Sequence, residues 1–163
     1  MTIKRITKEA DIARIAPLVA QFRVTLKAFK GVEAAPDEAA ADEELRSFLQ
    51  EGFPVFAAEK DGAVCGYLVC RVDEPCVWVE QLFVLPACRR QGIAGALFDR
   101  AEALAASYGE ETVYNYIHPN NAAIVAFLKS RGYNVLNLIE IRKPYAGETL
   151  TREVRVDEHR FDY

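Results

Sequence analysis

The residues best suited to chemistry form a basic, glycine-containing turn between a strand pattern and a helix pattern. Residues 77–84 have the apolar character of a strand, and residues 89–92 read Arg-Arg-Gln-Gly. The first amides of a helix lack intrahelical acceptors, so a helix that starts at such a turn can hold an anion such as a pyrophosphate. Gly92 has no Cβ and allows close backbone approach, while Arg89 and Arg90 add charge-assisted donors. The pattern therefore predicts a phosphate-binding turn.

The spacing Arg89-x-x-Gly92-x-Ala94 resembles the Arg/Gln-x-x-Gly-x-Gly/Ala signature of the GNAT N-acetyltransferase superfamily. A second match follows at residues 121–133, which begin with Asn and end with Gly-Tyr, like a later helix of that family. The two matches have the expected order. The resemblance implies an acetyl-CoA-dependent enzyme whose turn binds the pyrophosphate through Arg89, Arg90, Gln91, Gly92, Ile93 and Ala94.

The resemblance also assigns roles on either side of the turn. In the family, the strand before the turn splays away from its neighbour at a bulge, and its main chain pairs with the pantetheine arm. Leu82, Phe83 and Val84 occupy that strand here. Asn121, at the start of the later helix, is implied to contact the CoA arm, and its residue type also suits a helix N-cap.

Glu80 is the candidate catalytic base. An amine must be neutral to attack a thioester, and a carboxylate acting directly or through water can take its proton. The resemblance places Glu80 where many family members carry such a base. Because side chains alternate along a strand, Glu80 and Leu82 are predicted to share one face and Gln81 to point to the other. The structural alternative for Glu80 is a solvent-facing or ion-paired side chain.

Leu128 departs from the family pattern. Many members carry Tyr at this point of the later helix, where its hydroxyl protonates the departing CoA thiolate, and Leu cannot do so. The thiolate of CoA is a fairly good leaving group, so three alternatives stay open: no acid is needed, water replaces the Tyr, or another hydroxyl does so, with Tyr116 and Tyr133 nearby in the sequence. A CoA-binding sensor without catalysis therefore stays open as an alternative, as does a binding protein for another phosphorylated ligand.

Residues 33–51 are strongly acidic, with seven carboxylates against the single basic residue Arg46. In the family this region often borders the acceptor site, so an acidic rim would attract a cationic small-molecule amine such as a polyamine or an aminoglycoside. The alternative is a solvated helix face, the commoner meaning of such a run. Acetylation of a protein N-terminus or lysine also stays open.

Composition and charge narrow the class of protein. The chain has 163 residues, 51% of them hydrophobic and 27% charged, which predicts one domain over residues 1–163. The net charge of −4 argues against a nucleic-acid partner. No apolar run reaches the ~18 residues that span a bilayer. The start of the chain lacks a signal-peptide pattern, so we expect a cytoplasmic protein without membrane partners.

Cysteine and histidine usage predicts no metal site. The four cysteines form no Cys-x-x-Cys pair, and only two histidines are present. In a cytoplasmic protein these cysteines are expected to be reduced thiols. The resemblance leaves a homodimer open, because the family often dimerises.

Hydrophobic periodicity predicts how the elements alternate. An Asp-Gly pair at residues 61–62 predicts a hairpin, and Pro17 predicts a kink or restart in the first helix. The pattern implies the α/β GNAT fold, a mixed, mostly antiparallel central sheet of about six to seven strands with helices on both faces. Strands are predicted at residues 2–6, 55–60, 63–72, 77–84, 112–117, 133–142 and 152–156, and helices from about 12, at 37–50, 92–107 and 122–131.

Overall fold

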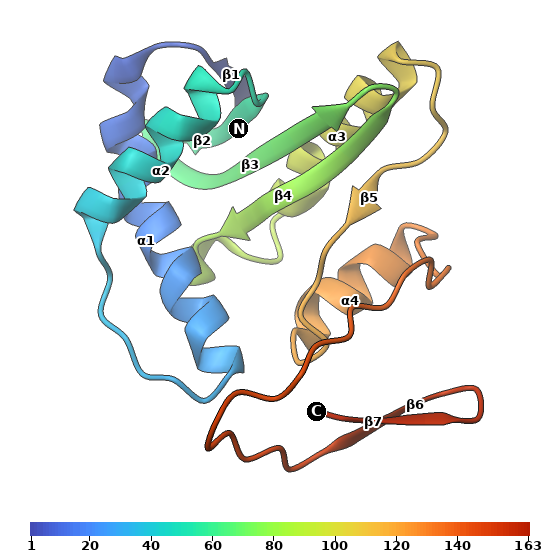
Figure 1. The fold of residues 1–163 in the computed structure, drawn as a ribbon. Helices are drawn as coiled ribbons and strands as arrows, with labels where there is room; N and C mark the ends of the chain where they lie inside the picture. Colours follow the sequence, from blue (N-terminus) through green and yellow to red (C-terminus); the bar gives the residue numbers. More distant parts are fainter. The chain divides into compact units, whose positions relative to one another are not determined.

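The computed structural model describes residues 1–163, which form two compact units, Met1–Phe127 and Leu128–Tyr163 (Figure 1). The prediction of a single domain stays a prediction. The elements in chain order are β1 (Thr2–Ile6), the 3-10 turn η1 (Glu9–Asp11), α1 (Ile12–Phe29), α2 (Glu38–Gln50), β2 (Val55–Lys60), β3 (Ala63–Asp73), β4 (Cys76–Val84), the 3-10 turn η2 (Pro86–Cys88), α3 (Ile93–Ser107), β5 (Tyr114–Asn115), α4 (Ala122–Ser130), β6 (Glu153–Val156) and β7 (His159–Asp162).

A five-stranded sheet in the order β1-β2-β3-β4-β5 forms the centre of the larger unit. The first four strands are antiparallel to their neighbours, and β5 runs parallel to β4. β2 and β3 meet at the predicted hairpin, where Asp61 and Gly62 have positive φ angles of 52° and 81°. A type I′ turn requires positive φ at both central residues. The predicted fold class is confirmed.

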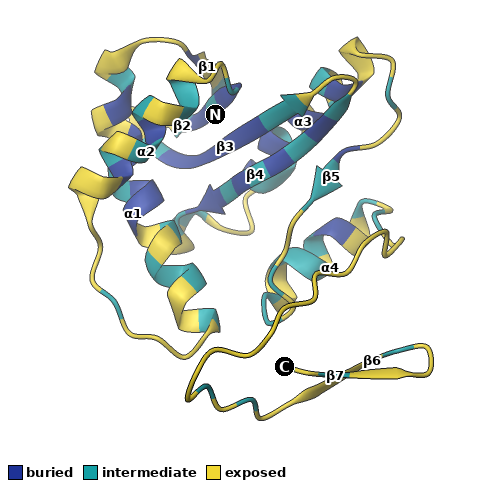
Figure 2. Ribbon diagram, viewed as in Figure 1, coloured by how far each residue is buried: buried dark blue, intermediate teal, exposed yellow.

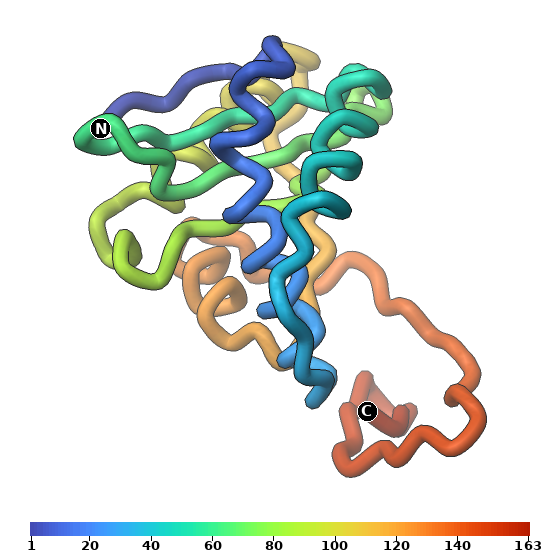
Figure 3. Tube along the Cα trace, turned by 90° about the vertical axis from the view of Figure 1, so that its left-hand side faces the viewer, coloured from blue at the N-terminus to red at the C-terminus, as the bar shows by residue number.

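Helices cover both faces of this sheet (Figures 1 and 3). α1 and α2 pack on one face, and their apolar side chains form a core with β2, β3 and Phe83 of β4. α3 covers the other face and buries Ile93, Leu97 and Phe98. Figure 2 shows that burial is concentrated in the central strands and on the inner sides of these helices. The sheet is therefore a rigid platform for residues at the end of β4.

Local sequence explains where the helices begin. Asp37 precedes α2 as predicted, and its Oδ1 accepts a hydrogen bond from the Ala40 amide at 3.0 Å, which satisfies one orphan donor. α1 is continuous through Pro17, so the predicted restart does not occur there. None of the helices is both long and apolar enough to cross a bilayer.

The second half of the chain departs from the predicted strands. Residues 133–142 form no strand, so that prediction is wrong, and their apolar side chains stay exposed, with Leu136 74% accessible. The strand predicted at 112–117 is reduced to β5, and the one at 152–156 forms β6. β6 pairs with β7, an unpredicted strand, in a separate two-stranded ribbon. Apolar alternation predicts an extended chain, but a strand also needs a neighbour to accept its hydrogen bonds.

Candidate functional site

β4 contains a bulge at Glu80. Val69 of β3 pairs with Gln81, whereas the next residue, Cys70, pairs with Val79, which leaves Glu80 as the additional residue of β4. Such a bulge disrupts the ladder locally and re-aims the side chains beside it. The family resemblance implied a bulge at Leu82–Val84; the strand does contain a bulge, but it lies at Glu80, the candidate base.

The sequence predicts that Gln81 points to the face of the sheet opposite Glu80, and this prediction is wrong. Both side chains point toward the helices on one face. Its Nε2 donates a hydrogen bond to Glu44 of α2, while Glu80 lines a cavity together with Phe22 and Leu26 of α1. The simple alternation that predicted opposite faces fails because the bulge inserts a residue into the period of two.

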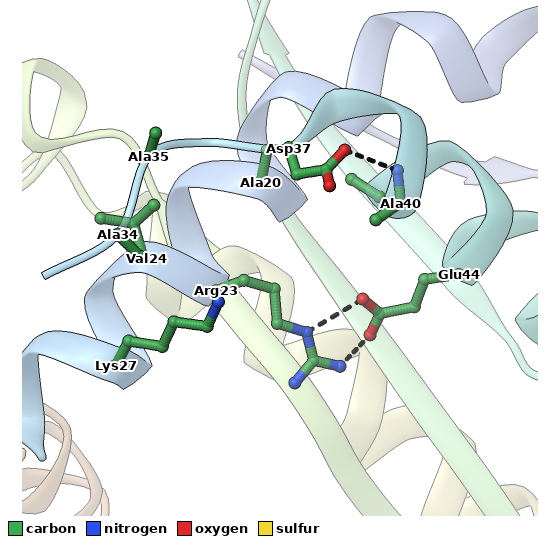
Figure 4. A pocket seen from close by; sticks show the side chains of 10 residues that line it. Ala20, Arg23, Val24, Lys27, Ala34, Ala35, Asp37, Ala40 and Glu44 are labelled. Carbon is green, nitrogen blue, oxygen red and sulfur yellow. Dashed lines mark hydrogen bonds and ion pairs between the residues drawn. The ribbon is translucent and has the colours of Figure 1, made fainter. Parts of the chain in front are cut away.

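Gln81 belongs to a buried polar chain that links the sheet to α1 and α2. Only 3% of Gln81 is accessible, and its Oε1 accepts a hydrogen bond from the Tyr67 hydroxyl at 2.7 Å. Glu44 also forms a two-pronged ion pair with Arg23 of α1 (Figure 4). Burial, and then the Glu44 carboxylate, raise the pKa of Tyr67 well above its usual value, so its hydroxyl stays a donor. The hydrogen bond with Glu44 raises the pKa of Arg23.

Glu80 is ion-paired, as the structural alternative predicted. Its Oε1 lies 2.9 Å from Nε of Arg71, a β3 residue that also pairs with Asp73 at 3.2 Å. The Arg71 guanidinium carbon lies over the Trp78 ring, 5.5 Å from its centroid. Arg71 therefore contacts both Glu80 and the Trp78 ring. Sequence reasoning missed Arg71, because only the strand pairing brings it opposite Trp78.

β4 and β5 diverge just before the predicted pantetheine strand. Their parallel ladder contains only the pairs Trp78 with Tyr114 and Val79 with Asn115, and β4 then continues to Val84 without a β5 partner. A cavity of about 50 Å³ lies beside this divergence. It is lined by Phe22, Leu26, Val79, Glu80, Leu82, Asn115, Tyr116, Ile117, His118, Asn121 and Ile124, and so brings together three of the predicted site residues. Leu82 is half-buried, and Phe83 and Val84 are buried.

The predicted phosphate turn has the backbone of a helix start. Gly92 is the residue before α3, with a φ of +79°, and nothing lies within 4 Å of where its Cβ would be. The first helical hydrogen bond runs from the Ala96 amide to the Gly92 carbonyl at 3.0 Å. The amides of residues 93–95 therefore precede the intrahelical ladder and suit an anion. Ile93 is buried, and Ala94 is half-buried.

Two side chains of the turn hold it in place, and a third can bind a ligand. Arg89 Nε donates to the Val84 carbonyl at 3.0 Å and so ties the turn to the end of β4. Gln91 is held by Lys60, whose Nζ lies 2.7 Å from Gln91 Oε1. Arg90 is exposed, has a φ of 62°, and its guanidinium forms no ion pair in the structure. Arg90 is therefore the side chain of this turn best placed for a phosphate.

The loop before α4 contributes residues that sequence reasoning treated only as a turn. Asn121 Oδ1 accepts a hydrogen bond from the Ile124 amide at 3.3 Å, so it caps α4 as its residue type predicted. His118 Nδ1 accepts from the Asn120 amide at 3.2 Å, and its ring stacks on Phe29 at 5.8 Å. Burial, and then the charge of Lys30, lower the pKa of His118. Leu128 is buried and offers no hydroxyl.

A second cavity of about 270 Å³ lies between α1 and α2 (Figure 4). Alanines form much of its wall, and Arg23, Lys27, Asp37 and Glu44 provide its charges. None of the predicted catalytic or CoA-binding residues lines it, although Asp37 and Glu44 belong to the acidic segment 33–51. The smaller cavity beside Glu80 is therefore the better candidate for the reaction, in spite of its size.

The four cysteines are free thiols and belong to no metal-binding group. Cys65 and Cys70 are buried, Cys76 and Cys88 are half-buried, and all are free thiols. Burial, and then the Glu80 carboxylate, raise the pKa of Cys70 to about 12. No group of His, Cys, Asp and Glu is arranged to hold a metal ion.

Comparison with known proteins places this geometry in a family. The model of the acetyltransferase (GNAT) family matches residues 21–133, which is most of the chain. The chain therefore belongs to the GNAT acetyltransferase family, whose members are acetyl-CoA-dependent transferases. None of the curated proteins matches the chain.

Solved structures agree with this fold. An aminoglycoside 6'-N-acetyltransferase from Acinetobacter haemolyticus is 22% identical, with a TM-score of 0.66 over 89% of this chain and 99% of that one. A second such enzyme, from Acinetobacter baumannii, is 20% identical, with a TM-score of 0.65 over 88% and 98%. A ribosomal-protein-alanine N-acetyltransferase from Brucella melitensis is 16% identical, with a TM-score of 0.65 over 89% and 100%. Their different acceptors mean that the shared fold leaves the acceptor of this chain undetermined.

Proposed function

We propose that this protein transfers the acetyl group of acetyl-CoA to the primary amine of a cationic small molecule by direct attack. The observation that supports this most is the order of groups along β4 and the following turn. Glu80 occupies the bulge, residues 82–84 follow without a β5 partner, and the helix start at residues 89–94 comes next. A proton acceptor, an open strand edge and an anion site thus follow one another along one continuous segment.

The residues of the turn fit the pyrophosphate of acetyl-CoA. The space beside Gly92 is open, and the amides of residues 93–95 precede the first helical hydrogen bond. We assign Arg90 to the phosphates directly. Arg89 and Gln91 hold the turn in place through Val84 and Lys60. Asn121, which caps α4 and lines the smaller cavity, is assigned to the CoA arm.

Glu80 is the best available base for the acceptor. Acetyl-CoA supplies a thioester whose carbonyl carbon is open to attack by a neutral amine. The Glu80 carboxylate receives the proton that the amine loses, directly or through water. Arg71 Nε lies 2.9 Å from that carboxylate and forms an ion pair with it. Backbone amides of residues 82–84 are assigned to the developing oxyanion, since preorganised donors stabilise such charge strongly.

The acceptor is assigned from the charge of residues 33–51. Two carboxylates of this segment are neutralised by arginine, Asp42 by Arg46 and Glu44 by Arg23. Glu33, Glu38 and Glu43 are exposed and form no ion pair. These three, with Asp37 and Glu51, which accept only hydrogen bonds, leave five carboxylates of the segment outside any ion pair and favour a cationic acceptor. The aminoglycoside enzymes with this fold make aminoglycosides the first class to test.

A titration followed by an assay tests the proposal. Acetyl-CoA is titrated calorimetrically into the wild-type protein, and CoA release is then measured with spermidine, kanamycin and a lysine-containing peptide, corrected for hydrolysis. Saturable binding with release that depends on spermidine or kanamycin supports the proposal. Release only with the peptide would point to a protein acceptor. Tight binding without release would support a sensor, and no binding would overturn the assignment of the turn.

A further inference from the structure

Tyr116 lies at the point where β4 and β5 separate. The last pair of their ladder is Val79 with Asn115; Glu80 is the next residue of β4, and Tyr116 is the first residue after β5. Both of these residues line the smaller cavity. Tyr116 therefore borders the same space as the candidate base, from the segment that follows β5.

The Tyr116 ring is held by stacking. It lies against Trp78 with a centroid distance of 4.7 Å and an interplanar angle of 11°, which is close to parallel. The same Trp78 ring carries the Arg71 guanidinium, and Arg71 binds Glu80. Stacked rings and cation–π contacts restrict the side chains involved. Tyr116 and Glu80 are thus fixed by one connected group of residues.

Tyr116 is also the one residue lining this cavity that has a hydroxyl. It is 63% accessible, so a proton that leaves its oxygen can be replaced from water. Tyr114 makes a useful contrast. It packs on the same Trp78 ring at 4.8 Å but does not line the cavity.

We propose that the Tyr116 hydroxyl protonates the thiolate of CoA as it leaves, an assignment that rests on the proposed acetyl transfer. The amine nitrogen forms a bond to the carbonyl carbon, and the carbonyl electrons move to oxygen. When they return, the carbon–sulfur bond breaks and its electron pair stays on sulfur. The Tyr116 proton passes to that sulfur, and the phenolate takes a proton from water. The amine proton passes to Glu80, so every proton has a donor and an acceptor.

The acidities of the two groups and the leaving ability of the thiolate set how much this proton transfer can contribute. Model phenols have a pKa of about 10 and model alkyl thiols of about 8.5, so the transfer to the thiolate is uphill by about 1.5 pKa units and is completed when the phenolate takes a proton from water. A thiolate leaves without help more readily than an alkoxide, which limits the effect of the acid. General acids contribute about 10²–10⁴-fold to catalysis, and the lower end applies to such a leaving group.

Two phenylalanine variants test the proposal. Tyr116→Phe keeps the ring on Trp78 and removes only the hydroxyl, and Tyr114→Phe removes the equivalent hydroxyl outside the cavity. The kcat for CoA release is measured with kanamycin or spermidine, whichever the wild-type protein accepts, together with the acetyl-CoA Kd and the pH profile of kcat. We expect Tyr116→Phe to lower kcat about tenfold to a hundredfold. Its Kd should stay within twofold, and Tyr114→Phe should match wild type.

The pH profile separates a proton donor from a structural role. If Tyr116 supplies the proton, the alkaline decline of kcat in the wild-type protein is weaker in Tyr116→Phe, since that variant has no phenol to lose its proton. A Tyr116→Phe kcat equal to wild type, or an equal loss in Tyr114→Phe, overturns the assignment. A wild-type protein that releases no CoA with any amine overturns the proposed function, and this assignment falls with it.

Discussion

The buried hydroxyl of Tyr67 donates to Gln81 Oε1 at 2.7 Å, and this hydrogen bond connects the centre of the sheet to the bulge in β4. Gln81 then donates to Glu44 of α2, so the residue next to the candidate base is held from both sides. Loss of Gln81 would leave the buried Tyr67 hydroxyl without its acceptor, and such a group is costly.

We expect Gln81→Leu to lower the free energy of unfolding by about 1–3 kcal/mol, because it leaves the buried Tyr67 hydroxyl without its acceptor, whereas Glu44 keeps its contacts with Arg23. Denaturation in urea measures this change. Gln50→Leu, at the exposed end of α2, is the matched control and should be close to neutral. Adding Tyr67→Phe to Gln81→Leu removes the unpaired hydroxyl and should recover part of the lost free energy of unfolding. A Gln81→Leu protein as stable as wild type would contradict the argument.

Gly92→Ala should weaken acetyl-CoA binding at least tenfold. Gly92 has a φ of +79°, which costs a residue with a Cβ about 1–2 kcal/mol, and the new methyl group would occupy the space assigned to the ligand. Gly109→Ala is a close control, since Gly109 has a φ of +81° and an equally open Cβ position. Both variants should lose similar stability in thermal melts. Equal acetyl-CoA affinity in the two would refute the assignment of the turn.

The stability of the fold should fall as the pH drops below the ordinary pKa of histidine, 6.5. The pKa of His118 is lowered in the folded protein, so the unfolded chain binds the proton first and is favoured by acid. Below the pKa of His118 in the folded protein, the contribution of His118 to the free energy of unfolding no longer changes with pH. His118→Asn keeps a hydrogen-bond acceptor for the Asn120 amide and should flatten the dependence of Tm on pH between about 7.5 and 5.5.

His159→Asn provides the comparison for that experiment. His159 is the other histidine of the chain and is exposed in β7. The His159→Asn protein should keep the wild-type slope. An unchanged slope in His118→Asn would show that the pH dependence comes from other groups.

Replacing Glu33, Glu38 and Glu43 together by Gln should raise the KM for a cationic acceptor several-fold and leave the acetyl-CoA Kd unchanged. These carboxylates are exposed and unpaired, so they act through long-range attraction. The difference from wild type should shrink near 1 M salt, where the Debye length is about 3 Å. The control changes Asp61, Glu111 and Glu158 to the corresponding amides. An equal rise in KM for the control would mean that net charge, and not this rim, attracts the acceptor.

Much of the first half of the fold could be predicted from local chemistry. The hairpin at Asp61–Gly62, the cap at Asp37 and the helix start after Gly92 each depend on a few adjacent residues, and all are present. The same holds for Asn121 as the cap of α4. These features follow from turn and capping preferences that hardly depend on the rest of the chain.

The sequence by itself therefore determined the order of the elements as far as α4, the family signature and the helix start after Gly92. Only the tertiary structure decided the bulge at Glu80, the direction of Gln81, the pairing of Arg71 with Glu80 and the place of Tyr116 beside the cavity. It also decided that residues 133–142 form no strand. Each of these outcomes depends on which strand lies opposite which and in what register, and a periodic pattern in one segment does not name its partner.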